Sequence, residues 1–299
     1  MNPFAAALIL VSTLFHAGWN LLARRRRAEA LFFYRLLLIV VVIGLVPAAL
    51  SEWYVRSLPP TVWLYVLGSG VFCGFYFLFL AKGYAASDFT VVYPVARALP
   101  VLLVGLGDVL RGRYPTTMGW AGMLLVALGC LLAPQRSFRD LSPRRYLNRA
   151  TVWILLTAFS TVGYTMLDKM ASEIVTQGPG TAARYGYAFY LFTFLFYALF
   201  LRVAQRLGAV EDAAPSHAQD IGWRLPVLGG LFNFGAYWLV LWAYQLTERA
   251  SYVVAFRQFS IVIGVVLAFI LYREEGRWVR ITATILITAG LVLIGLRGH

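Results

Sequence analysis

Long apolar segments separated by short polar stretches recur along the whole chain. Each segment has about 20 residues, the length that a helix needs to cross the ~30 Å hydrocarbon core of a bilayer. The apolar runs are continuous, whereas strands of a membrane barrel alternate apolar and polar residues with a period of two. The pattern therefore predicts an all-α integral membrane fold with ten transmembrane helices, at about 3–22, 29–50, 61–80, 89–110, 117–133, 150–167, 184–201, 225–246, 251–271 and 278–296.

One polar stretch divides this series in the middle of the chain. It reads PQRSFRDLSPRRYLNR, carries two prolines and lies between the fifth and sixth predicted helices. Such a stretch is typical of a linker between two structural units. We therefore expect a five-helix repeat over residues 1–135, a linker over 136–149 and a second five-helix repeat over 150–299.

The two halves also resemble each other in sequence. The segment that begins VVYPVARALPVLLVG can be laid over the one that begins YVVAFRQFSIVIGVV, which places Gly129 over Gly290 and Thr90 over Ser251. Five helices make an odd number of crossings, so the two repeats must enter the membrane with opposite orientations. Inverted repeats around a central cavity are an architecture of secondary transporters, with the substrate site near the bilayer midplane.

Composition supports a membrane protein and excludes several other classes. The chain is 61% hydrophobic and only 13% charged, with a mean hydropathy of +0.73. Its net charge of +13 resides in loop arginines, so membrane topology explains it better than nucleic-acid binding. The two cysteines lie in apolar segments and the three histidines are far apart, so we expect no metal site and no cofactor.

Lys and Arg residues are unevenly shared between the two sets of loops. The loops on the side opposite the termini, which include the four arginines of residues 24–27, carry more than twice as many as the loops on the termini side. The positive-inside rule places the arginine-rich loops in the cytoplasm and both termini outside. We expect a multi-pass protein of the bacterial inner membrane.

Two arginines lie well inside predicted helices, Arg97 in the fourth and Arg257 in the ninth. An arginine near the bilayer centre costs about 2.5–3.5 kcal/mol on insertion scales unless it faces water, a partner or a ligand. Asp108 shares nearly the same helical face as Arg97 but lies roughly 16 Å along the axis, too far for a direct pair. We predict that both arginines bind substrate in a central cavity. Structural pairing or snorkelling to the headgroups is the alternative.

Two prolines flank the first of these arginines. Pro94 and Pro100 have no N–H to donate to the preceding turn, so we predict that they bend the fourth helix and form a hinge around Arg97. A kink that only shapes the packing is the alternative. The substrate-facing stripe of this helix is predicted to include Thr90, Tyr93 and Arg97.

Further polar and aromatic side chains interrupt the apolar segments. At the end of the first predicted helix, His16, Trp19 and Asn20 stand at positions i, i+3 and i+4 on one face, suited to substrate or to a neighbouring helix. Asp168 and Lys169 follow the sixth predicted helix, where they are suited to an interfacial charge pair. The remaining candidate substrate-binding residues are Tyr76, Tyr164, Trp238 and Gln258.

Motifs of several other activities are absent from the sequence. It contains no phosphate-binding loop of the form GxxxxGK[ST], no HExxH and no nucleophile elbow, so we expect neither ATP hydrolysis nor another enzymatic activity. Asp108 is the only carboxylate well inside a predicted helix, with Asp168 and Glu173 near an end. The sequence therefore gives no indication of proton coupling.

Four sequence motifs resemble those of a known superfamily. They are FHAGWNLLARR, GYAASDFTVVYPVARALPVL, GYTMLDK and ERASYVVAFRQFSIVIGVVLAFILYREEG, in this order along the chain. Together they resemble the drug/metabolite transporter superfamily in its ten-helix form, built of two EamA-type domains. Glu274 matches the family's glutamate after the ninth helix, but its counterpart in the first half is Arg113. The resemblance implies transport, often export, of small metabolites, amino acids or drugs, and termini in the cytoplasm, opposite to the charge rule.

We therefore predict a secondary transporter that exports small metabolites by alternating access. Amino acids or related zwitterionic or carboxylate solutes fit best, because arginines bind carboxylates through paired hydrogen bonds. The alternatives are export of cationic or aromatic drugs by the same fold and, as a different class, a membrane-embedded lipid-modifying enzyme. The expected partners are the solute and the lipid bilayer, with the protein acting as a monomer.

Overall fold

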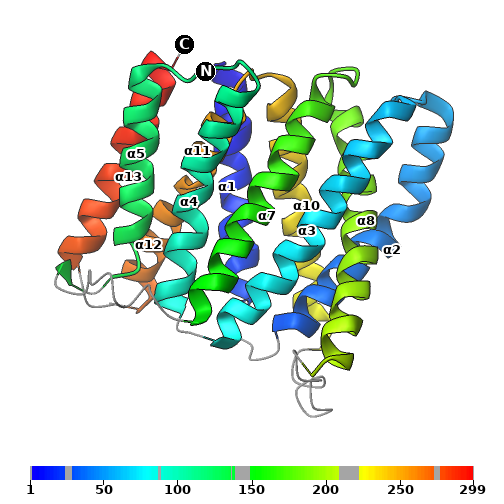
Figure 1. The fold of residues 1–299 in the computed structure, drawn as a ribbon, viewed down its shortest axis with the longest axis horizontal. Coiled ribbons are helices and arrows are strands. Elements are labelled where there is room, and N and C mark those ends of the chain that lie inside the picture. The colour runs from blue at the N-terminus through cyan, green and yellow to red at the C-terminus, as the bar shows by residue number, and fades with distance from the viewer. Residues whose placement is uncertain are drawn as a thin grey trace.

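The computed structural model describes residues 2–23, 29–86, 89–135, 137–138, 149–208, 222–272 and 277–298. Side chains are described for these residues except 20–23, 29, 84–86, 89–95, 149–150 and 267–272. Every long element of this part of the chain is a helix (Figure 1). The helices are α1 (Pro3–Ala23), α2 (Glu29–Val55), α3 (Pro60–Ala86), α4 (Phe89–Leu110), α5 (Thr117–Leu132), α7 (Arg149–Ser172), α8 (Pro179–Arg206), α10 (Arg224–Gln245), α11 (Ala250–Arg257), α12 (Phe259–Tyr272) and α13 (Arg277–Arg297).

The ten predicted spanning segments are all present, which confirms the fold class, but several helices extend beyond their predicted ends and the ninth is interrupted. The sixth, α7, continues to Ser172 instead of ending near residue 167, so it includes Asp168 and Lys169. The ninth is two helices, because α11 ends at Arg257 and α12 begins at Phe259. The fourth, α4, contains both prolines and is assigned as one continuous helix. The hinge at Pro100 stays a prediction, and the side chain of Pro94 lies outside the described residues.

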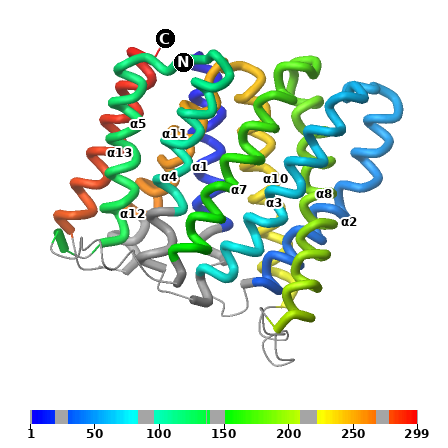
Figure 2. The backbone as a smooth tube through the Cα atoms, viewed as in Figure 1, coloured from blue at the N-terminus to red at the C-terminus, as the bar shows by residue number. Residues whose placement is uncertain are grey.

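Helix packing follows the internal repeat. α3 packs extensively on α7 and α1 on α10, so the third helix of each half lies against the first helix of the other half. The fifth helices of the two halves, α5 and α13, also pack on each other, as do α2 and α8. This reciprocal packing is the contact pattern of two halves related by a pseudo-two-fold axis in the membrane plane. Both termini lie at the same end of the bundle (Figures 1 and 2).

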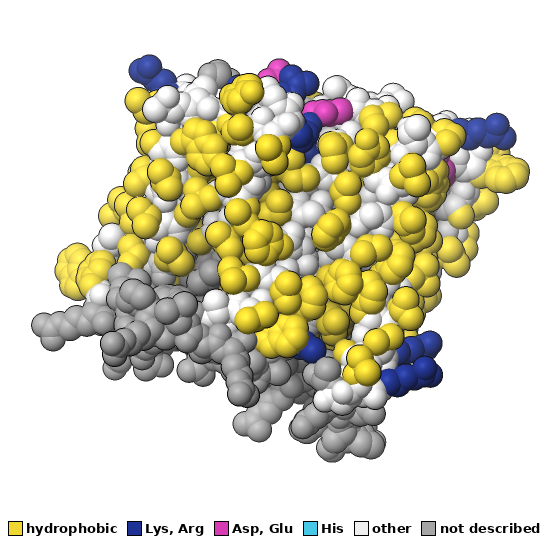
Figure 3. Space-filling view, viewed as in Figure 1, with side chains coloured by type: hydrophobic (Ala, Val, Ile, Leu, Met, Phe, Trp, Pro, Cys, Tyr) yellow, Lys and Arg dark blue, Asp and Glu magenta, His cyan; other side chains and the backbone are white. Residues whose placement is uncertain are grey.

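The outer surface of the bundle is apolar. Figure 3 shows a broad band of hydrophobic side chains, with charged side chains near its two ends. In the described part of the chain, five helical segments are each long and apolar enough to cross a membrane, and shorter apolar helices complete the set. Polar backbone groups inside a bilayer must be bonded within the protein, which helices achieve by themselves. The protein is therefore a multi-pass membrane protein. The five long segments are Ala30–Val55, Pro60–Gly83, Pro179–Arg206, Arg224–Gln245 and Arg277–Arg297.

Two glycines allow α5 and α13 to touch backbone to backbone. A Cβ atom on Gly122 would lie 2.6 Å from the carbonyl oxygen of Gly290, and one on Gly290 would lie 2.5 Å from the carbonyl oxygen of Gly122. Both distances are shorter than a carbon and an oxygen can approach. Small residues at such crossings are how membrane helices associate closely.

Gly290→Ala is expected to destabilise the protein, because the added methyl group forces α5 and α13 apart. Overpacking of this kind costs about 1–3 kcal/mol, which thermal unfolding of the purified protein in detergent will register as a lower Tm. The matched control is Gly264→Ala on α12, where an added Cβ has no neighbour within 4 Å. Equal Tm values for the two variants would contradict the close crossing.

Candidate functional site

Two adjoining cavities lie at the centre of the bundle and share His16, Tyr76, Tyr164 and Arg257 as lining residues. Each has a volume of about 40 Å³, enough for a few water molecules. Their walls come from both halves of the chain, as the midplane site of an inverted-repeat protein requires. The first is further lined by Trp19, Cys73, Phe77, Phe189, Tyr190, Asn233, Ala236 and Tyr237. The second is further lined by Leu80, Ala96, Arg97, Pro100, Thr161, Val254 and Gln258.

The break between α11 and α12 leaves a backbone carbonyl without its helical partner. In a continuous helix the N–H of Ile261 would bond to the carbonyl of Arg257, but here it donates to the carbonyl of Gln258 at 2.8 Å. The Arg257 carbonyl instead accepts the Ser260 hydroxyl at 3.0 Å. Broken helices inside a membrane are tolerated where other groups bond the freed carbonyls.

Arg97 of α4 fastens this break from the other half of the chain. Its guanidinium donates to the Ser260 hydroxyl at 2.8 Å and to the Arg257 carbonyl at 3.3 Å. A third contact, at 2.8 Å, joins Arg97 Nη1 to Nε2 of His16 on α1. Arg97 thus lines the cavity and also holds α1, α4 and the α11–α12 break together. The structural pairing predicted as the alternative is present, and substrate binding by Arg97 stays a prediction.

Arg257 has a different environment from Arg97. Among the residues that the structure describes, its guanidinium makes no hydrogen bond and no ion pair, and its one specific contact is with the ring of Tyr237, 5.4 Å from the ring centroid. None of the described residues that line the two cavities is acidic. A cation without a counter-ion at this depth is costly and marks a functional position. This side chain is the strongest candidate for contact with a ligand.

Aromatic rings surround the two arginines. Tyr237 packs against Phe189 with 4.8 Å between ring centroids and against Tyr164 at 6.0 Å in an edge-to-face arrangement. Tyr76 contacts Tyr164 in the same way at 5.9 Å. Edge-to-face packing fixes the ring positions, so the cavity offers an ordered aromatic wall beside two fixed positive charges.

Two hydrogen-bond donors face the His16 imidazole, which in its neutral form has one accepting nitrogen. The Trp19 indole N–H donates to its Nδ1 at 3.1 Å, and Arg97 faces its Nε2 at 2.8 Å. One of these contacts therefore places two donors against each other. The positive charges of Arg97 and Arg257 beside this histidine favour an anionic or carbonyl-bearing group.

One acid that was not predicted as a site residue lies directly behind the cavity wall. Asp168 is completely buried, and its carboxylate accepts bonds from Ser69 at 2.5 Å, Tyr185 at 2.7 Å and Tyr237. The statement that Asp108 is the only acid well inside a helix is therefore wrong, because α7 extends past the predicted end and carries Asp168 with it. The signal that could have identified it is its i+4 spacing from Tyr164, which continues the polar face of the helix.

Asp168 and Lys169 do not pair with each other, because adjacent residues of a helix point in different directions. Lys169 turns to the Tyr244 carbonyl and to Glu173, each at 3.0 Å. The charge pair suggested by the sequence is therefore absent. Asp168 makes its contacts behind the cavity, and Lys169 makes its contacts at the end of the bundle.

The structure gathers most of the predicted site residues at the cavities. Trp238 is not among their lining residues, and its indole donates to the Pro179 carbonyl at 2.8 Å. The side chains of Asn20, Thr90 and Tyr93 lie outside the described residues. The predicted residues that line the cavities are His16, Trp19, Tyr76, Arg97, Tyr164, Arg257 and Gln258.

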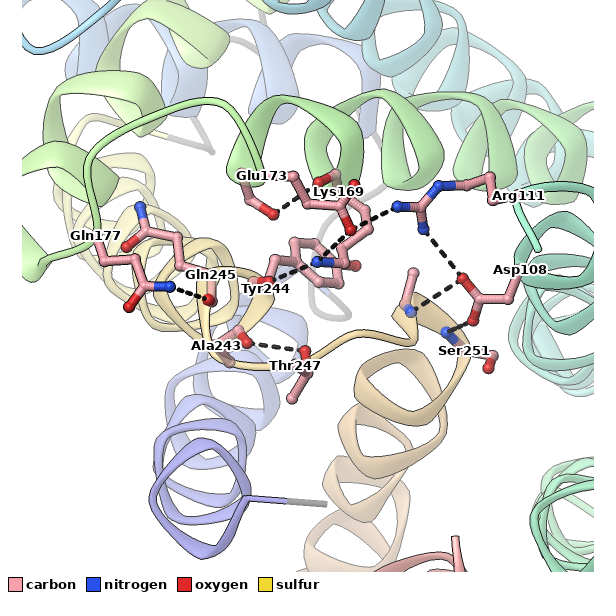
Figure 4. Close-up of polar contacts among 12 residues, drawn as sticks. Asp108, Arg111, Lys169, Glu173, Gln177, Ala243, Tyr244, Gln245, Thr247 and Ser251 are labelled. Atoms are coloured by element: carbon pink, nitrogen blue, oxygen red, sulfur yellow. Dashed lines mark hydrogen bonds and ion pairs between the residues drawn. The ribbon is translucent and has the colours of Figure 1, made fainter. Parts of the chain in front are cut away.

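A network of charged groups joins the two halves of the chain at the termini end of the bundle (Figure 4). Asp108 of α4 accepts the backbone N–H groups of Ala250 and Ser251 at the start of α11, at 3.2 and 2.8 Å. Arg111 bonds to Asp108 at 3.3 Å and to Glu173, beyond α7, at 2.7 Å. Because Asp108 lies three helical turns from Arg97, this network lies on the termini side of the cavity.

The network is expected to weaken in acid. Although partial burial opposes ionisation, hydrogen bonds from Arg111 and Lys169 hold the pKa of Glu173 below its usual range. Its ion pairs therefore stabilise the fold at neutral pH, and this contribution is lost as the pH falls through and below the ordinary glutamate value of about 4.3. We expect Glu173→Gln to lower the stability by about 0.5 kcal/mol at pH 7, the size of a partly exposed pair. Thermal unfolding should show this difference vanishing at acid pH, and a pH-independent difference would contradict it.

Comparison with known proteins agrees with this architecture. The model of the EamA-like transporter family matches residues 3–133 and 148–296, and each matched segment contains five spanning segments. A solved crystal structure superposes with a TM-score of 0.66 over 98% of each chain, at 16% sequence identity, which shows a shared fold. No curated protein matches the chain. The chain belongs to the EamA-like transporter family, and it is a membrane transporter of the drug/metabolite superfamily.

Proposed function

We propose that this transporter moves small solutes with a carboxylate group, amino acids first among them, through the central cavity. The observation that carries the proposal is the guanidinium of Arg257, which faces the cavity with no counter-ion among the described residues. A carboxylate supplies the missing charge and two acceptor atoms for bidentate hydrogen bonds.

The aromatic wall supports a solute with a second, less polar part. Tyr76, Tyr164 and Tyr237 present ring faces or edges that accept apolar side chains, and ring faces also attract an ammonium group. An amino acid combines a carboxylate with both of these features. The arginines disfavour the alternative of a cationic drug, because two fixed positive charges repel it.

A solute larger than a few water molecules needs more room than the cavities offer in this conformation. Transport therefore requires the halves to move apart on one side at a time. Opening on the termini side has to break the bonds of Asp108 to Ala250 and Ser251 and the bond of Arg111 to Glu173. We assign this network as the closed gate of that side.

We further propose that the transporter acts as a monomer in the bacterial inner membrane, with the arginine-rich loops in the cytoplasm, and that net transport is export. The Lys and Arg bias between the loops supports the orientation. Both termini lie at one end of the bundle (Figure 1), so reporters fused to either terminus should agree. A C-terminal reporter active only outside the cytoplasm would support this orientation, and an inactive one would contradict it.

Counterflow in proteoliposomes tests the proposed activity without knowledge of the energy source. Purified protein is reconstituted with one unlabelled amino acid inside, and entry of the same labelled compound is measured across a panel of amino acids. Phenylalanine is the first probe, because it pairs a carboxylate with an aromatic ring. If folded protein exchanges no member of the panel, the proposed substrate class is wrong.

A native cysteine provides a second measurement of binding. Cys73 lines the first cavity, and the other cysteine, Cys130, is buried elsewhere in the bundle. In a Cys130→Ala background, a transported amino acid should slow alkylation of Cys73 by a small thiol reagent. The matched amino-acid amide, which lacks the negative charge, should leave the alkylation rate unchanged.

A further inference from the structure

A single tyrosine connects the buried acid to the cavity arginine. The hydroxyl of Tyr237 donates to Oδ2 of Asp168, and the ring of the same residue lies beneath the guanidinium of Arg257. Asp168 has no Lys or Arg partner among the described residues. Since Tyr237 also lines the cavity, the acid is one residue away from cavity water.

The helices packed around Asp168 present hydroxyl groups to its carboxylate. α3 contributes Ser69, α8 contributes Tyr185 and α10 contributes Tyr237. Lys169 on α7 and Glu173, just beyond its end, turn toward the network at the termini end. The charged group that faces Asp168 is Arg257, across the Tyr237 ring. The other titratable groups nearby are Cys73, Tyr164, Tyr190 and Tyr244.

This environment can hold the acid with or without its proton. A hydroxyl group both donates and accepts, so the three hydroxyls that donate to a carboxylate can rotate, and one of them can accept from a protonated acid. Neither state leaves a carboxyl oxygen without a partner. An uncompensated carboxylate in a membrane interior is costly, which makes the proton a natural ligand of this site.

We propose that Asp168 is a proton-binding site coupled to the solute site, so that a proton and a carboxylate solute cross together. The proposal rests on the proposed function, because it places the solute carboxylate at Arg257. An empty site leaves the Arg257 charge free to stabilise ionised Asp168. A bound solute carboxylate neutralises that charge, so Asp168 takes up a proton from cavity water.

Coupling of this kind is reciprocal, so protonation of Asp168 raises the affinity for the solute by the same factor as the solute raises the affinity for the proton. The proton is taken up from water on one side and released to water on the other, and no other bond is made or broken. Export of a solute down its own gradient then carries one proton outward with each molecule.

Proton uptake on binding tests this directly. Phenylalanine, or the amino acid that the counterflow panel ranks first, is added to the purified protein in weakly buffered detergent solution containing a pH indicator. The wild-type protein should take up a measurable fraction of a proton per bound solute, at most about half for a tenfold coupling between the two sites. Asp168→Asn, which keeps the shape of a neutral acid, should bind the solute with no proton uptake. Glu52→Gln, which removes an acid at the edge of the bundle, should retain the uptake.

If Asp168→Asn does not fold, the pH dependence of solute binding by the wild-type protein tests the same coupling. The affinity of the wild-type protein for the solute should rise about tenfold between pH 8 and pH 5, within the usual range of coupling between two sites. Solute binding with no proton uptake and no pH dependence would overturn the coupling and leave the transport proposal standing. Absence of any solute binding by folded protein would instead overturn the transport proposal.

Discussion

Arg257→Ala is expected to abolish carboxylate transport while leaving the stability of the protein nearly unchanged. The guanidinium has no hydrogen bond or ion pair to lose among the described residues. A buried guanidinium carries a desolvation cost, which here is not offset by any direct hydrogen-bond or ion-pair partner among the described residues, so its removal costs the fold little. Losing a charged partner of the ligand costs about 3–5 kcal/mol of binding, a fall of roughly 100-fold or more. Counterflow and thermal unfolding of the same preparation measure the two effects.

Arg257→Lys is the matched variant for this prediction. It keeps a positive charge but loses the planar, two-pronged hydrogen-bond geometry. We expect it to restore part of the affinity without full transport. Wild-type counterflow by Arg257→Ala would remove this residue from the site, and a marked loss of Tm would show that its role is structural.

Arg97→Ala is expected to reduce transport and stability together. The substitution removes bonds to the Ser260 hydroxyl, the Arg257 carbonyl and His16, and so loosens the helix break that these bonds fasten. Hydrogen bonds that involve a charged group contribute about 1.5–3 kcal/mol each, so a net loss of about 2–4 kcal/mol is expected after local rearrangement. Thermal unfolding should show a clear fall in Tm, in contrast to Arg257→Ala.

A second substitution separates the two roles of Arg97. Ser260→Ala removes one partner of Arg97 at the break but leaves both arginines in the cavity. It should lower the Tm by less than Arg97→Ala and retain counterflow. Unchanged stability of Arg97→Ala would contradict the fastening role that the three contacts imply.

Much of the fold was predictable, because the length and the uninterrupted apolar sequence of each spanning segment identify it as a membrane helix. The inverted arrangement followed from an odd number of helices in a repeated unit. The boundaries were harder, since polar residues near a membrane helix end fit equally well inside or outside the helix. Asp168 and Lys169 looked like the residues after a helix, but their side chains are bonded to other helices, which allows α7 to continue to Ser172.

The candidate site was predictable only in part. The two arginines stood out because a charge in an apolar segment has few explanations, and both line the cavities. Their different environments were not predictable, because a break at Gln258 depends on bonds from Arg97 in the other half of the chain. Tyr237 and Asn233 gave no signal either, since one aromatic or polar residue among many does not reveal which face turns inward.

The most direct test of the account is counterflow of an amino acid compared with its own amide by the wild-type protein. The two solutes share size and side chain, and the amide lacks the carboxylate that Arg257 is proposed to bind. We predict that at least one amino acid of the panel is exchanged and that its amide is exchanged at least roughly 100-fold less efficiently, the cost of a lost charged partner. Equal exchange of the amide would contradict the central claim that the cavity arginine binds a carboxylate.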